Sequence, residues 1–218
     1  FFTTLFQGMM QFIPERTIML KERAGGSYHL SAYFLSKTLS ETPVRLIFPF
    51  VYLLICYPMT NLGPDVVTFI GVCGTLLLAA LAGESIGLFI GTSTGNHEKA
   101  MVTATLVSLT LMLCGGFYAQ NLPPVVQWLR YLSPFKYSYD ACLQLTFMND
   151  IPCDGSTTLP GCYYKYPNES VPGSEAVAYL GATESIGFNL GLLVLFILFF
   201  RLLSYLSLRF LPFNNPTK

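Results

Sequence analysis

Charged residues are scarce in this sequence. They make up 11% of its 218 residues, whereas hydrophobic residues make up 52% and the mean hydropathy is +0.52. A typical soluble domain carries about 25% charged residues, so this chain has too little polar surface to cover a water-soluble fold. Its 12 basic residues balance 12 acidic ones, which leaves no basic field for binding nucleic acid. Composition therefore indicates a protein whose solvent is the lipid bilayer.

Motifs for catalysis, nucleotide binding and metal binding are also missing from the sequence. No G-x-x-x-x-G-K-[ST] run occurs, so this chain has no P-loop with which to hold ATP. It has only two histidines, and no His or Cys cluster has the spacing of metal ligands. No Ser or Cys is placed to form a catalytic triad with His97. We therefore predict no catalytic residue, no metal and no resident cofactor in this chain.

Long apolar runs are what the sequence has instead. Because a helix needs about 20 apolar residues to cross about 30 Å of hydrocarbon, four of these runs are long enough to span a membrane. The predicted fold class is an all-α, polytopic transmembrane helix bundle forming a single domain. The predicted segments are, in order, the end of a span at 1–13, a cytoplasmic segment at 14–37, spans at 38–60, 66–92 and 99–119, an external region at 120–186, and a last span at 187–210.

Basic residues set the predicted orientation, because Lys and Arg in short loops stay on the cytoplasmic side. The segment 14–37 contains four of them, Arg16, Lys21, Arg23 and Lys37. The turn before the span 99–119 and the C-terminal tail are also basic, whereas the turn at 61–65 has no Lys or Arg. These assignments alternate along the chain, so we expect an integral, multi-pass membrane protein with the segment 14–37 in the cytoplasm.

The external region contains two cysteines outside apolar surroundings, Cys153 and Cys162, and the glycosylation sequon Asn168-Glu169-Ser170. An oxidising compartment favours a Cys153–Cys162 disulfide and a glycan on Asn168. Free thiols or bridges to a partner chain are the alternatives. These features predict the plasma membrane or another membrane of the secretory route.

Aromatic and basic residues crowd together within 122–147, after the helix-breaking run Leu122-Pro123-Pro124. Trp128, Tyr131 and Lys136 belong to this group, which suits the lipid head-group level. We predict a short amphipathic helix at the outer interface. If that helix is re-entrant, its backbone must be buried in protein, because lipid leaves polar groups unpaired.

Charged residues within the predicted spans are costly and need partners, and three of them form a possible cluster. Glu41 and Arg45 are four residues apart and share one helix face. Glu84 lies in the next, antiparallel span and reaches a depth similar to that of Arg45. We predict an intramembrane Glu41–Arg45–Glu84 cluster that ties the cytoplasmic segment to the core. The alternatives are a protonated Glu84, a Glu84 bonded to a nearby Ser or Thr, and a proton relay through Glu84.

An ordered series of short motifs runs through the chain. It comprises Phe12-Ile13-Pro14-Glu15-Arg16, Lys21-Glu22-Arg23, Tyr28-His29-Leu30-Ser31-Ala32-Tyr33, Leu39-Ser40-Glu41-Thr42-Pro43, Gly115-Gly116-Phe117, Leu122-Pro123-Pro124 and Tyr131-Leu132-Ser133-Pro134-Phe135-Lys136-Tyr137. In order and spacing this series resembles the G subfamily (white type) of ABC transporters, over essentially the whole chain. The resemblance implies the C-terminal part of an ABC-2 type transmembrane domain, from the end of the second transmembrane helix to the sixth. Such a domain is the permease of an ATP-driven exporter of hydrophobic or amphipathic compounds that are lipid-, sterol- or drug-like.

The resemblance also implies partners and residue roles. Coupling to a nucleotide-binding domain, on its own or a partner chain and holding the ATP and Mg²⁺, falls to Glu22, Tyr28, Ser31 and Tyr33. A second half-transporter, identical or different, completes a cavity, and the substrate path and plug fall to Thr105, Leu109, Met112, Phe117 and Tyr118. The alternatives are an interfacial loop anchored by tyrosines for the first group and ordinary helix packing for the second. For the whole chain, the alternative is a channel or a non-transporting membrane scaffold.

Overall fold

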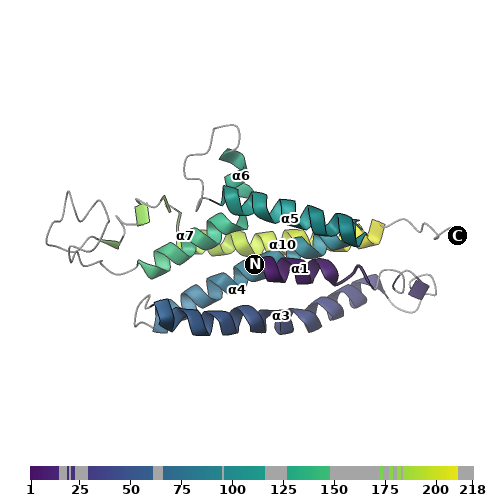
Figure 1. Cartoon of the computed structure of the whole chain (residues 1–218), viewed down its shortest axis with the longest axis horizontal. Helices are drawn as coiled ribbons and strands as arrows, with labels where there is room; N and C mark the ends of the chain where they lie inside the picture. The colour runs from purple at the N-terminus through teal and green to yellow at the C-terminus, as the bar shows by residue number, and fades with distance from the viewer. Residues whose placement is uncertain are drawn as a thin grey trace.

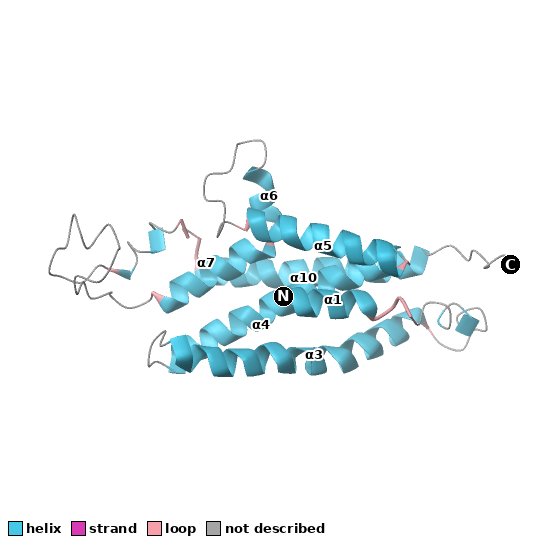
Figure 2. Cartoon of the chain, viewed as in Figure 1, coloured by secondary structure: helices cyan, strands magenta, loops and turns pink. Residues whose placement is uncertain are grey.

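The computed structural model describes most of the chain, namely residues 1–14, 19, 21–22, 29–60, 66–94, 96–115, 127–147, 172–173, 177–178, 181–182 and 184–210. Helix accounts for nearly all of these residues, and no strand occurs among them (Figure 2). The helices are α1 (Phe2–Met10), α3 (Leu30–Thr60), α4 (Val66–Thr94), α5 (His97–Cys114), α6 (Gln127–Leu132), α7 (Pro134–Thr146) and α10 (Ile186–Phe210). The all-α fold predicted from the sequence is confirmed.

The long helices lie lengthwise beside one another, and α4 is the central one (Figure 1). It contacts α1, α3, α5, α7 and α10, and its buried residues extend from Val72 to Thr92. The start of α3, the start of α5 and the ends of α4 and α10 all lie at one end of the bundle (Figure 1). We call this the basic end, because the predicted cytoplasmic segment joins α1 to α3 there.

Three helices of the described part, α3, α4 and α10, are long and apolar enough to cross a membrane. They correspond to the predicted spans 38–60, 66–92 and 187–210. However, α3 already begins at Leu30 and has 31 residues, so the last part of the predicted cytoplasmic segment forms its first two turns. Residues 30–37 are amphipathic, but they include no proline or glycine, so the helix continues through them.

The fourth predicted span, 99–119, corresponds to α5, which has 18 residues in the described part. Its first turn is polar, and the side chain of Asn96 caps it by accepting a hydrogen bond from the backbone N–H of Glu98 at 3.0 Å. Because three of its 18 positions are the polar residues His97-Glu98-Lys99, α5 is not among the three helices above. Residues 116–126, which follow it, lie outside the described part.

Glycines bring α4 into backbone contact with α1. Gly83, Gly87 and Gly91 recur at four-residue spacing, which places them on one face of α4. A Cβ atom built on Gly87 would lie 2.0 Å from the carbonyl oxygen of Leu5, and one on Gly91 would lie 2.3 Å from that of Met9. No side chain fits there, so α1 packs against α4 as membrane helices with small residues at their interface do.

Where the sequence predicts one short interfacial helix, the structure has two helices, α6 and α7. Of these, α7 packs against α4 and α10 and starts with Pro134, at the N-terminal position where proline is favoured. Burial lowers the pKa of Lys136 and raises that of Asp140, since a charge is disfavoured away from water. Lys136 and Asp140 are 6% and 2% exposed, so these charged side chains of α7 are buried in protein, and the re-entrant position of the helix stays a prediction.

Candidate functional site

A stripe of charge runs along the first half of α3. Lys37, Glu41 and Arg45 follow one another at four-residue spacing and therefore share one helix face. The Lys37 Nζ lies 3.5 Å from Glu41 Oε1, and the Arg45 guanidinium forms an ion pair with the other oxygen of the same carboxylate. Glu41 thus links a cation on each side of it.

Glu84 of α4 is the centre of a larger group of polar side chains. It is 1% exposed and forms ion pairs with two arginines from different helices. Arg45 Nη1 lies 2.9 Å from its Oε1, and Arg201 Nη2 of α10 lies 3.4 Å from its Oε2. The Thr42 hydroxyl of α3 also donates to it, at 3.2 Å. One buried carboxylate therefore joins α3, α4 and α10.

Neutral polar groups also accept hydrogen bonds from both arginines. Arg45 Nη1 donates to Gln11 Oε1 at 3.0 Å, and Gln11 immediately follows α1. Arg201 Nε donates to the Ser85 hydroxyl at 3.4 Å, and its Nη2 donates to Thr42 at 3.2 Å. We call this group the Glu84 network; its members are Gln11, Glu41, Thr42, Arg45, Glu84, Ser85 and Arg201.

The electrostatics of the Glu84 network follow from its surroundings. A charge inside a membrane domain costs several kcal/mol unless it is paired and hydrogen-bonded. Here the carboxylate of Glu84 meets two guanidinium groups, and each guanidinium also has a neutral acceptor. Removal of Glu84, Arg45 or Arg201 would leave a buried charge without one of its ion-pair partners, so these three residues depend on one another.

The structure brings together the three residues that the sequence predicts as a cluster, Glu41, Arg45 and Glu84. It adds Arg201, which the sequence reasoning missed. The signal was present, because Arg201 is the only charged residue in α10 before Arg209, and an intramembrane arginine needs a partner. Gln11 and Ser85 gave no comparable signal, since their neutral side chains occur widely in helices.

Three of the four predicted coupling residues, Glu22, Ser31 and Tyr33, lie within the described residues, and their coupling role stays a prediction. Glu22 and Ser31 are exposed. Tyr33 is half-buried, and its ring centroid lies 6.2 Å from that of Phe12. Tyr28 lies outside the described residues.

An aromatic cluster fixes the start of α3 to its neighbours at the basic end. The Phe34 ring stacks on Phe12 with centroids 5.8 Å apart, and it lies 5.9 Å from the Tyr205 ring of α10. Phe12 and Phe34 are 3% and 8% exposed. This packing joins the residue stretch after α1, the start of α3 and the last turns of α10 into one body.

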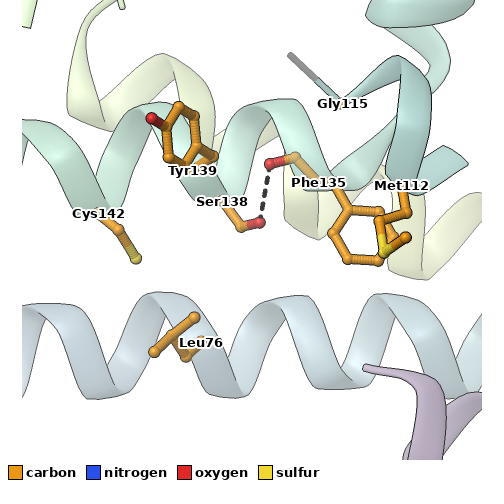
Figure 3. Close-up of a pocket in the computed structure, with 7 residues that line it drawn as sticks. All are labelled: Leu76, Met112, Gly115, Phe135, Ser138, Tyr139 and Cys142. Atoms are coloured by element: carbon orange, nitrogen blue, oxygen red, sulfur yellow. Dashed lines mark hydrogen bonds between the residues drawn. The ribbon is translucent and has the colours of Figure 1, made fainter. Parts of the chain in front are cut away.

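The predicted substrate-path residues occupy two different environments on α5. Thr105 and Leu109 are exposed on the single chain, whereas Met112 is half-buried. Met112 lines a cavity of about 330 Å³ between α4, α5 and α7. In Figure 3, Met112 lies beside the Phe135 ring, and Cys142 points from α7 toward α4, where Leu76 lies. Phe117 and Tyr118 lie outside the described residues.

The predicted modification sites also fall outside the described part of the chain. They are Cys153, Cys162 and Asn168. The disulfide and the glycan therefore stay predictions. The cysteines of the described part, Cys56, Cys73, Cys114 and Cys142, are free thiols.

Known proteins match this chain over most of its length. A family model described as an ABC-2 type transporter matches residues 1–147. Protein white of Drosophila melanogaster is 29% identical over 214 residues, which cover 95% of this chain and 30% of the relative. ABC transporter G family members 21 and 25 of Arabidopsis thaliana are 30% and 31% identical, over 95% and 96% of this chain.

The chain spans only 30% and 33% of the length of those two plant relatives. The names of the relatives agree with the G-subfamily resemblance that the sequence motifs carry, and the apolar helices agree with an integral membrane protein. The chain belongs to the ABC-2 type transporter family, as a membrane domain of the white-type G subfamily.

Proposed function

We propose that this chain is the permease part of an ATP-driven exporter of hydrophobic or amphipathic compounds, lipid-, sterol- or drug-like in chemistry. It works with a nucleotide-binding domain, on its own or a partner chain, that holds ATP and Mg²⁺. A second half-transporter, identical or different, faces it across the substrate cavity. The membrane is the plasma membrane or another membrane of the secretory route.

The Glu84 network is the observation that carries this proposal. Helix α3 runs without a break from Leu30 at the basic end to Thr60. Its charged stripe meets α4, α10 and the end of α1 through Glu84 and Arg45. A displacement applied to the start of α3 would therefore move three other elements together, which is the rigid link that alternating access requires.

The exposed face of α5 supports the proposed cargo. Beyond the first turn, where His97, Glu98 and Lys99 are exposed, its large exposed side chains are apolar. Thr105 donates its hydroxyl to the backbone carbonyl of Met101 at 2.8 Å. A second half-transporter placed against this face would close a path with few fixed charges. Such a path supports apolar or amphipathic cargo over sugars and ions.

Replacement of Arg201 with Gln tests the mechanical role of the network. In the full-length transporter, reconstituted in proteoliposomes, Arg201→Gln should reduce the transport of a fluorescent amphipathic compound per ATP hydrolysed by about 5- to 150-fold, the range of a typical coupling free energy. ATP hydrolysis itself should persist, because this chain has no P-loop. The measurement is the ratio of compound moved to phosphate released.

Arg209→Gln is the matched control, since Arg209 is an exposed arginine on the same helix. It should leave the ratio unchanged. Equal ratios for Arg201→Gln and wild type would contradict the mechanical role of the network. Compound flux that ignores ATP and non-hydrolysable ATP analogues would instead favour a channel, and no flux at all would favour a membrane scaffold.

A further inference from the structure

The cavity between α4, α5 and α7 has a volume of about 330 Å³, and the accessible surface inside it is almost wholly apolar (Figure 3). The Ser138 hydroxyl, one of the polar groups in its wall, donates to the backbone carbonyl of Phe135 at 3.1 Å. That donor is therefore already satisfied within α7. A molecule in the cavity would meet carbon and sulfur atoms rather than polar groups in need of a partner.

Contacts at both ends of α7 keep this cavity from collapsing. Near the start of the helix, the Ser133 hydroxyl donates to the backbone carbonyl of Leu111 in α5 at 2.7 Å, and Ser133 is 0% exposed. Near its end, Leu145 packs on Gly71 of α4, where a Cβ atom built on the glycine would lie 3.0 Å from Leu145 Cδ2. The part of α7 that lines the cavity, 135–142, lies between these two contacts. It therefore cannot move toward α4 without breaking one of them.

The wall of the cavity is poorly hydrated. Burial raises the pKa of the Cys142 thiol to about 11, because a thiolate is disfavoured away from water. Apolar cavities of this kind stay dry, and one of about 150 Å³ engineered in another protein binds benzene. The cavity between α4, α5 and α7 has about twice that volume, so it has room for about two aromatic rings.

The side chains around the cavity favour an aromatic molecule over a saturated one. Met112 contributes a thioether, Cys142 a thiol, and Phe135 and Tyr139 contribute rings. Sulfur atoms make favourable contacts with aromatic rings, and aromatic rings also pair with one another. In Figure 3 the sulfur of Met112 lies beside the Phe135 ring, and the sulfur of Cys142 points toward α4. Sulfur thus borders the cavity from α5 as well as from α7.

We propose that this cavity binds a neutral aromatic molecule of about two fused rings, held between Leu76 of α4, Met112 of α5 and Cys142 of α7. The bound molecule contacts all three helices and stabilises their packing. The site depends on how these helices pack and not on ATP or transport. Failure of the proposed export function would therefore leave it standing.

Modification of Cys142 tests the site, in full-length protein in detergent micelles that keeps Cys142 as its only cysteine. The reagent is methyl methanethiosulfonate at mildly alkaline pH, and the probe is naphthalene. At ten times its half-protecting concentration, naphthalene should slow the modification about tenfold, since only unoccupied protein reacts. Decalin, which is saturated and of similar size, should need a concentration in the micelle about 2- to 13-fold higher, the contribution of one sulfur–aromatic contact. The charged probe naphthalene-2-sulfonate should not protect.

Leu76→Phe fills the cavity from α4 and should abolish protection by naphthalene. Leu54→Phe adds the same bulk on the exposed surface of α3, where Leu54 is 53% exposed, and should keep the protection. If Leu76→Phe lowers the melting temperature, Met112→Phe fills the cavity from α5 instead. As a second readout, naphthalene should raise the melting temperature of the unfilled protein and of Leu54→Phe, but not that of the filled variant.

Three results would overturn the proposal. Modification of Cys142 at an unchanged rate in naphthalene would show that the cavity does not bind it. Equal protection by decalin or by naphthalene-2-sulfonate would contradict the assignment to a neutral aromatic molecule. Protection that survives both Leu76→Phe and Met112→Phe would show that naphthalene binds elsewhere.

Discussion

Replacing Glu84 with Gln should lower the free energy of unfolding of this domain by about 3–5 kcal/mol, the usual cost of breaking a buried ion pair. The substitution keeps the size of the side chain and removes its charge. Arg45 and Arg201 then face a neutral amide at a site where Glu84 is 1% exposed. Denaturant unfolding of the purified full-length protein in detergent micelles measures the change.

Glu41→Gln is the control for this prediction, because Glu41 is in the same network but its side chain is 34% exposed. Its replacement should cost less than that of Glu84, since solvent screens a partly exposed pair. The double variant Glu84→Gln/Arg201→Gln should cost less than the sum of its single variants, because the residues interact. Strict additivity would contradict a direct Glu84–Arg201 contact.

Gly87→Ala should separate α1 from α4 and lower the free energy of unfolding by about 1–3 kcal/mol, the usual cost of overpacking. The added Cβ would meet the carbonyl oxygen of Leu5 at 2.0 Å. Backbone atoms cannot rotate away as a side chain can, so the helices must shift. Because Gly87 is on the helix that carries Glu84, we also expect lower transport. Denaturant unfolding and transport assays measure both effects.

Gly74→Ala is the matched control on the same helix, since nothing lies within 4 Å of a Cβ built there. Alanine is a better helix former than glycine, by about 1 kcal/mol. Gly74→Ala should therefore leave stability unchanged or raise it slightly. If Gly87→Ala behaved like Gly74→Ala, the close contact between α1 and α4 would be disproved.

The fold class followed from composition and the length of the apolar runs, because only helices and closed barrels satisfy their backbone hydrogen bonds within a bilayer. Helix ends were harder to predict. The basic and polar residues of 30–37 indicate an exposed segment, but exposure at a membrane surface does not end a helix, and α3 starts at Leu30. Run length also pointed to a full span at 99–119; α5 covers His97–Cys114, and because residues 116–119 lie outside the described part, this span stays a prediction.

The charged members of the candidate site could be predicted, because a charge within a membrane span needs a partner of opposite charge. Glu41 and Arg45 follow from helical spacing, and Glu84 follows from depth. Gln11 and Ser85 join the network only because the turn after α1 and the position of α10 bring them there. No local pattern encodes that geometry.

The membrane orientation of the bundle is the claim on which the account depends most. Its direct test is labelling of single cysteines with a membrane-impermeant maleimide in intact cells, in a background without other cysteines. Lys21→Cys marks the predicted cytoplasmic segment, and Met59→Cys, at a site 80% exposed near the other end of α3, marks the outer side. We predict that Met59→Cys reacts in intact cells and Lys21→Cys only after permeabilisation. Labelling of Lys21→Cys in intact cells would invert the bundle and contradict coupling to a cytoplasmic ATPase.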